Sequence, residues 1–303
     1  MNPARAQVIP TGDVTLGSAG CSVRSGMIEH MSRRKRLGAA AAVAAAAVAL
    51  SACSTATGGA PVTDPATSNV TVAVGAQAAD PSAEVESTWL TIPATQADAA
   101  PKRIELTQTA SGARCTAGPA IAAASTPTRR GFVVAGHCDE LPGSAVSAGG
   151  ESIEPYTDTQ RGDRGVTVTW GAANAAPTVA GGFKVAGVLK QDVVQRLEYG
   201  TPVCMDGAIS GVQCGTVTEN DASGIYVKLP IERGDSGAPL FLVSDRGTAT
   251  LIGIVEQRSG NFTFGAYLDP LLAEVGAKVL TDRTAAIDPR TDPRYSDAVT
   301  VAQ

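Results

Sequence analysis

Ser236 lies in the stretch ERGDSGAP, residues 232–239, where glycines stand on both sides of an Asp-Ser pair. Glycine adopts backbone conformations that other residues avoid, so the spacing predicts a tight turn that presents the serine and aims amide N–H groups at one point. Such a turn suits a nucleophile beside an oxyanion hole, although a polar loop between strands can have the same composition. A serine hydroxyl is a weak nucleophile until a base takes its proton. Whether Ser236 is a nucleophile or part of a polar loop therefore depends on a base elsewhere in the chain.

His137 is the candidate base. The chain has two histidines, and the other, His30, falls in the N-terminal region that we assign to a leader. His137 stands in AGHC, residues 135–138, after the apolar stretch FVVA and beside a cysteine. A lone histidine is more often structural, but a position at a strand end next to a crosslink favours a fixed, functional ring. We therefore expect His137 to act as general base.

Asp163 is the candidate acid that would orient this ring. It lies between the histidine and the serine in sequence, in RGDRG, directly before the alternating stretch 166–170. A buried carboxylate at that point could hold the imidazole tautomer and stabilise the imidazolium. Asp158 and Asp139 are rivals, and Asp139 is too close to His137 in sequence to reach its ring.

Four cysteines lie outside the N-terminal third, which contains Cys21 and Cys53. In an exported protein an even set predicts two disulfides. Three pairings are possible, and proximity in sequence favours Cys115–Cys138 and Cys204–Cys214. No C-x-x-C pair is present, so we predict no metal site, and we expect no cofactor.

Short apolar stretches separated by turns with Gly or Asn run from about residue 103 to 280. The clearest are residues 132–135, 166–170, 183–188, 225–229 and 251–255. This pattern predicts an all-β barrel or sandwich. One helix is expected after Asp269-Pro270, with Asp as its cap, Pro in its first turn and apolar residues at helical spacing as far as Val279.

The N-terminal third predicts export. Four basic residues, 33–36, precede a fourteen-residue apolar run too short to span a bilayer. The run ends in LSAC, residues 50–53, which resembles a bacterial lipobox. We expect a lipoprotein signal over 31–52 and a diacylated Cys53 that anchors the protein at the outer face of the bacterial cytoplasmic membrane, with secretion as the alternative.

The other boundaries follow from composition. Residues 1–30 are expected to be an upstream extension or a mis-assigned start, and 53–102 a lipidated cysteine followed by a flexible linker rich in Ala, Thr, Pro and Ser. Residues 103–280 form the predicted folded domain, and 281–303 a polar, disordered tail. The net charge of −5 and the lack of a basic face argue against a nucleic-acid partner.

Taken together, the motifs resemble those of the chymotrypsin-type serine proteases, specifically the small bacterial streptogrisin and alpha-lytic type. The resemblance covers about residues 104–280, and the chain order His, Asp, Ser is also theirs. It is carried by FVVAGHC at 132–138, GD at 162–163, VC at 203–204 with CG at 214–215, GDSG at 234–237 and YLDP at 267–270. It implies two six-stranded antiparallel β-barrels, a C-terminal helix and an active site between the barrels.

The resemblance also implies roles for individual residues. His137 would act as general base and then as acid, Asp163 as its partner and Ser236 as the nucleophile. The amides of Gly234 and Ser236 would form the oxyanion hole. Lys102-Arg103-Ile104 could be a processing site.

Two departures from the family pattern lead to further expectations. Met205 stands where relatives often have Arg, so we expect Asp235 to need another cation. Beside the substrate pocket, Glu256-Gln257-Arg258 stands where relatives have Ser-Gly-Gly or Ser-Trp-Gly. We expect Glu256 near Asp163, Arg258 as the cation that separates the two carboxylates or compensates Asp235, and a pocket obstructed by Arg258 that favours small or acidic P1 side chains.

The sequence therefore predicts an exported, monomeric serine endopeptidase that acts on protein or peptide substrates and meets the membrane through its lipid anchor. A pseudoprotease, with the same barrels used as an extracytoplasmic binding module, is the alternative from another class. An esterase of the α/β-hydrolase type would need Gly-x-Ser-x-Gly and the order Ser, Asp, His, and the chain has neither.

Overall fold

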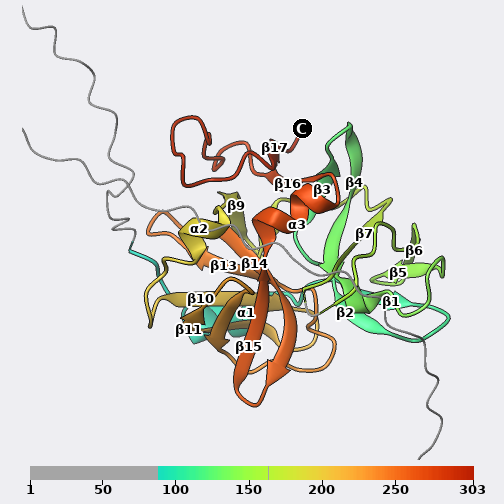
Figure 1. The fold of residues 1–303 in the computed structure, drawn as a ribbon, viewed down its shortest axis with the longest axis horizontal. Coiled ribbons are helices and arrows are strands. Elements are labelled where there is room, and N and C mark those ends of the chain that lie inside the picture. The colour runs from blue at the N-terminus through green and yellow to red at the C-terminus, as the bar shows by residue number, and fades with distance from the viewer. Residues whose placement is uncertain (1–87, 163) are drawn as a thin grey trace, which may run out of the picture. The chain divides into compact units, whose positions relative to one another are not determined.

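The computed structural model describes residues 88–162 and 164–303 (Figure 1). The leader, Cys53, most of the predicted linker and Asp163 lie outside the described residues. Among the residues described, no helix is long and apolar enough to cross a membrane.

The C-terminal half is a closed antiparallel barrel. Its strands are β10 (Pro202–Gly207), β11 (Gly211–Asn220), β12 (Ile225–Lys228), β13 (Pro239–Val243), β14 (Thr248–Ser259) and β15 (Phe262–Tyr267). They pair in the order β13-β10-β11-β12-β15-β14, and β14 returns to β13. Apolar side chains that alternate along the strands, such as Leu240, Leu242 and Ile252, fill its interior. β8 (Thr178–Val179) and β9 (Phe183–Val188) extend the sheet beyond β14.

The N-terminal half consists of two sheets. One contains β1 (Glu105–Gln108), β2 (Arg114–Thr116), β5 (Val146–Ala148) and β6 (Glu151–Ile153). The other contains β3 (Ala120–Ala123), β4 (Thr126–Ala135) and β7 (Val166–Trp170), joined by β16 (Ala277–Thr281) and β17 (Val299–Val301). Leu106, Phe132 and Val134 pack between the sheets. The predicted all-β fold is confirmed.

The helices are few and short: α1 (Ala94–Ala99), the 3-10 turn η1 (Gly136–Cys138), α2 (Gln191–Val194) and α3 (Leu268–Glu274). The predicted C-terminal helix is present as α3, but two of its details were wrong. Asp269 lies in the first turn and makes no side-chain cap. The helix ends before Gly276, whose φ is +59°, so that Val279 belongs to β16 and not to the helix.

Residues 88–102 are not a free linker, which corrects the expectation for this segment. The Leu90 amide donates to Val243 O (2.9 Å), adding a bridge to the barrel edge. Ile92 is buried in one hydrophobic cluster, and Trp89, which is partly buried, packs against another, the barrel core. Two large apolar side chains in an otherwise polar stretch are enough to dock it.

The segment 281–303 is also ordered, so the expected disordered tail is wrong. β17 pairs in parallel with β16, and β16 pairs antiparallel with β3 (Figure 1). Tyr295 is buried in the barrel core, and its hydroxyl lies 3.2 Å from Thr250 Oγ1. The ring occupies space that Gly187 leaves open, because a Cβ there would lie 2.6 Å from Tyr295 Cδ1. Burial raises the pKa of Tyr295.

Candidate active site

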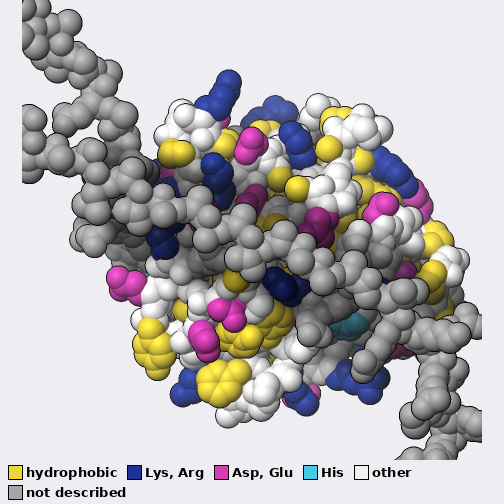
Figure 2. Space-filling model, in the orientation of Figure 1, with side chains coloured by type: hydrophobic (Ala, Val, Ile, Leu, Met, Phe, Trp, Pro, Cys, Tyr) yellow, Lys and Arg dark blue, Asp and Glu magenta, His cyan; other side chains and the backbone are white. Residues whose placement is uncertain are grey.

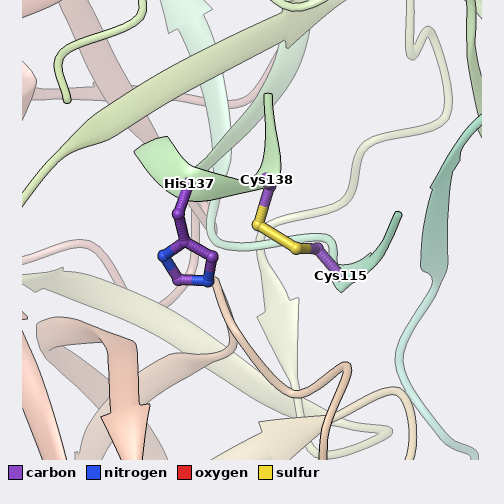
Figure 3. A group of neighbouring side chains, drawn as sticks. All are labelled: Cys115, His137 and Cys138. Carbon is purple, nitrogen blue, oxygen red and sulfur yellow. A yellow bond between two sulfur atoms is a disulfide. The ribbon is translucent and has the colours of Figure 1, made fainter. Parts of the chain in front are cut away.

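His137 follows directly on β4, in the turn η1. The next residue, Cys138, is disulfide-bonded to Cys115, and Cys204 to Cys214, so both predicted pairings are confirmed. The imidazole lies beside the disulfide (Figure 3), and the His137 side chain is 47% exposed. The two sulfurs lie near the ring, but they are bonded to each other and offer no thiolate to a metal ion.

Ser236 occupies the tight turn that the glycines predict. Gly234 has a φ of +106° and Gly237 a φ of +87°, conformations that favour glycine. The turn is held from two sides, because the Thr116 amide donates to Ser236 O (2.8 Å) and the Gly237 amide to Val255 O (2.8 Å). Ser236 is therefore fixed between β2 and β14.

The same segments that hold Ser236 also carry His137. Thr116 is adjacent to Cys115, whose disulfide reaches the residue after the histidine. A Cβ on Gly237 would lie 2.6 Å from Thr116 O and 3.4 Å from Ala135 N. The serine turn thus packs against the end of β4, two residues before His137.

The amides of Gly234 and Ser236 make no hydrogen bond to any of the described residues. Gly234 is buried, whereas Ser236 is partly exposed. The carbonyl of Gly234 is fixed by the Thr116 hydroxyl (2.9 Å). Two available donors on one rigid turn are what binding of an oxyanion requires.

Among the described residues no cation pairs with Asp235, which is buried, and this corrects the expectation that it needs one. Its Oδ1 accepts from the amides of Ile209 (3.0 Å) and Ser210 (3.1 Å). Its Oδ2 accepts from the Glu232 amide (2.8 Å) and the Ser210 hydroxyl (2.5 Å). Four hydrogen-bond donors therefore satisfy the buried carboxylate.

Arg258 does not compensate Asp235 either. Its Nη1 donates to Ile231 O (2.9 Å) and lies 3.9 Å from the Glu232 carboxylate. The guanidinium therefore extends from β14 to the segment just before the Ser236 turn.

The acids weighed in the sequence have different surroundings. Asp139 is buried and accepts from Gln108 Nε2 (3.0 Å) and Thr159 Oγ1 (2.7 Å), so its role is structural. Asp158 is exposed and accepts from the hydroxyl of its neighbour Thr157. Burial, and then the Asp139 charge, raises the pKa of Tyr156.

Asp163 itself lies outside the described residues, but the loop that contains it is positioned at both ends. The Gly136 amide donates to Gly165 O (2.8 Å), and the Gln160 amide to Val166 O (2.7 Å). A Cβ on Gly136 would lie 2.1 Å from Gln160 O. The loop ends therefore pack directly against the residue before His137.

Glu256 is the acid that lies next to the histidine among the described residues. Its Oε2 is 3.5 Å from His137 Nδ1, and its side chain is 1% exposed. It sits on β14 at a β-bulge, since Val255 pairs with Gly265 and Gln257 with Phe264. We expected Glu256 in the substrate pocket and near Asp163. The signal for its burial was available, because it directly follows the apolar run LIGIV.

A cavity of about 530 Å³ lies beside the bulge. Its lining residues are Arg161, Gly162, Arg164, Ser223, Tyr226, Gln257, Arg258, Ser259, Phe262 and Phe264. The predicted pocket residues Gln257 and Arg258 line it, and Glu256 does not. Each arginine donates to a backbone carbonyl: Arg161 to Asp139 (3.0 Å), Arg164 to Ala222 (3.1 Å) and Arg258 to Ile231. Basic and hydrophobic side chains occur close together on the face in Figure 2.

Comparison with known proteins gave matches in sequence and in structure. No family model matches the chain. Two proteins of Mycobacterium tuberculosis, Uncharacterized protein MT1863 of strain CDC 1551 / Oshkosh and Uncharacterized protein Rv1815 of strain ATCC 25618 / H37Rv, are each 30% identical over 141 residues. The match covers 45% of this chain and 58% of each relative, so it spans little more than half the length of the relatives.

Among solved structures, the chain is similar to Nocardiopsis protease (TM-score 0.46, 24% identity, 59% of this chain and 97% of that one). It is also similar to Thermobifida fusca protease A (0.46, 22%, 58% and 96%) and to Cellulomonas bogoriensis chymotrypsin (0.46, 24%, 58% and 96%). The chain itself has an all-β fold with a closed six-stranded antiparallel barrel, two disulfides and a glycine-flanked turn at Ser236.

Proposed function

We propose that this chain is a serine endopeptidase that hydrolyses peptide bonds through an acyl-enzyme intermediate. The proposal depends chiefly on one observation. Ser236 lies on a rigid turn with two available amides, and the segments that fix the turn also carry His137. Fold alone would not suffice, since one fold hosts active and inactive members.

The chemistry follows from these groups. Ser236 Oγ attacks the carbonyl carbon of the scissile bond while its proton passes to Nε2 of His137. The carbonyl π electrons move to oxygen, and the amides of Gly234 and Ser236 stabilise that negative charge, at about 2.7–4 kcal/mol for each donor. The C–N bond then breaks as His137 returns the proton to the leaving amine. Water then attacks the acyl-enzyme as His137 takes its proton, and the carboxylic acid product leaves as His137 returns the proton to Ser236 Oγ. Asp163 is the predicted residue that orients the His137 ring.

A fluorophosphonate probe tests the proposal directly. The wild-type protein should be labelled, and mass spectrometry of its peptides should place the adduct on Ser236. Heat-denatured protein is the control, because labelling requires the folded site. A folded wild-type protein that is not labelled would instead support a pseudoprotease, the alternative favoured by the unusual Glu256-Gln257-Arg258 segment.

Arg258 should restrict the P1 side chain. Its guanidinium reaches from β14 to Ile231 O, just before the Ser236 turn, so we expect it to obstruct the approach to Ser236 and to favour small or acidic P1 residues. Arg258→Gly should raise kcat/KM for P1 Phe by roughly tenfold or more, since burying a large side chain contributes about 1.5–3 kcal/mol. Profiling of a peptide library measures the change.

Arg164→Ala is the matched control for that experiment. It removes one positive charge from the same cavity but leaves the link between Arg258 and Ile231 in place. Efficient wild-type cleavage after Phe or Tyr, with no gain in Arg258→Gly, would contradict the obstruction.

We also propose that the protein is exported and anchored by lipid on Cys53. Two disulfides support an oxidising compartment. Cys53→Ser should release the protein from the membrane fraction or leave the signal uncleaved, as measured by fractionation and intact mass. Cys21→Ser is the control and should change neither. Unchanged partitioning of Cys53→Ser together with normal cleavage of its signal would rule out the anchor.

A further inference from the structure

We propose that Glu256 is a positioning residue that holds the His137 ring in the tautomer with its proton on Nδ1, an inference that rests on the proposed function. The acid would act from β14 in the C-terminal barrel. It would hold the ring alone or together with Asp163.

Burial and distance support this role. The carboxylate of Glu256 is almost fully buried, while the ring that it faces is about half exposed. A buried carboxylate is costly unless a charged or hydrogen-bonding partner offsets its desolvation. Nδ1 of His137 lies 3.5 Å away, a separation that can shorten when substrate binds, since catalytic hydrogen bonds are often long in free enzymes.

The backbone fixes the direction of the carboxylate. Glu256 is the extra residue of the bulge, and bulges re-aim side chains beside active sites. Val255, the preceding residue, accepts the amide of Gly237 from the serine turn. The peptide unit between Ser236 and Gly237 is therefore hydrogen-bonded to the one between Val255 and Glu256. This bond to β14 sets the position of the acid relative to the nucleophile.

The contact involves Nδ1, and this has a chemical consequence. A neutral imidazole carries one N–H, and a carboxylate at Nδ1 accepts from it, which leaves the lone pair on Nε2. Nε2 can then take the Ser236 proton, and the resulting imidazolium stays paired with the carboxylate. Glu256 itself exchanges no proton. The step balances because Ser–OH, neutral imidazole and the substrate carbonyl give a tetrahedral oxyanion and imidazolium.

Glu256→Gln tests the role by NMR of the histidine ring nitrogens, at a pH where the ring is neutral. The full-length chain has two histidines, and a His30→Gln background leaves only His137. We expect wild-type His137 to carry its proton on Nδ1. In Glu256→Gln the amide N–H₂ can donate to Nδ1, so the population should move to the Nε2 tautomer. The value of kcat should fall about 10²–10⁴-fold with KM nearly unchanged.

Two variants serve as controls. Asp139→Asn neutralises another buried carboxylate, one bound to Gln108 and Thr159, and should leave the tautomer unchanged. Glu256→Asp keeps the charge and should keep the Nδ1 tautomer, with a kcat between those of wild type and Glu256→Gln. A general loss of packing would not distinguish Asp from Gln in this way.

Each outcome decides the proposal. A wild-type ring with its proton on Nε2 overturns it without any variant, even if Glu256→Gln fails to fold. An unchanged tautomer in folded Glu256→Gln also overturns it, whether or not Asp163→Asn moves the tautomer. Because the NMR measurement needs no substrate, it is independent of fluorophosphonate labelling. If the wild type is labelled but the tautomer does not move in Glu256→Gln, only the role of Glu256 is refuted. If the tautomer moves but the wild type is not labelled, only the peptidase function is refuted.

Discussion

Ser236→Ala should abolish peptidase activity and fluorophosphonate labelling while leaving the thermal midpoint nearly unchanged. Loss of a serine nucleophile lowers kcat on the order of 10⁶-fold. Among the described residues, Ser236 Oγ makes no hydrogen bond, whereas the bond from the Thr116 amide to Ser236 O survives the substitution. Turnover of a peptide substrate and a thermal melt measure the two effects.

Ser210→Ala is the matched control for this variant. The Ser210 hydroxyl donates to Asp235, the neighbour of the nucleophile, so its loss should lower the free energy of unfolding by about 1.5–3 kcal/mol. Labelling of Ser236 should persist. Full activity in Ser236→Ala would refute the mechanism.

Asp206→Ala should lower the free energy of unfolding by about 3–5 kcal/mol, because it leaves a buried cation unpaired. Asp206 Oδ2 lies 3.3 Å from Arg103 Nη1, and the two side chains are only 4% and 10% exposed. Burial lowers the pKa of Arg103, and the Asp206 charge opposes that shift. Urea unfolding of the variant measures the loss.

The exposed pair of Asp192 and Arg196 provides the control. Their side chains are more than 60% exposed and 3.0 Å apart, so Asp192→Ala should cost no more than about 1 kcal/mol. Similar losses in the two variants would show that the Arg103 pair contributes no more than a surface contact.

Arg103 also bears on the expected processing site. The guanidinium donates to the carbonyls of Ala117, Gly118 and Thr178 as well as to Asp206. A protease that cleaves after arginine must bind that side chain. In this fold it is not accessible, so Lys102-Arg103 would be cleaved only before the domain folds.

The sequence predicted best the features that depend only on residues close together in the chain. Glycines with positive φ at 234 and 237 define the turn, and alternation predicts strands such as Val166–Trp170. Cysteines close in sequence pair as expected.

The sequence was least informative where distant segments meet. Tyr295 and Ile92 dock into clusters formed by residues distant in sequence, and the apolar residues 89–92 indicate that this segment can dock but not where. The bulge that turns Glu256 toward His137 depends on the register between β14 and β15. Asp235 is satisfied by amides of a neighbouring hairpin, an arrangement that exists only after β10 and β11 have paired.

The sheet behind His137 is assembled from both ends of the described chain. β3, β4 and β7 come from residues 120–170, whereas β16 and β17, which complete the sheet, come from residues 277–301. Contacts of such sequence separation form late, and until they form β3 has an unpaired edge. The histidine-bearing half is therefore complete only once β16 has paired with β3 and β17 with β16.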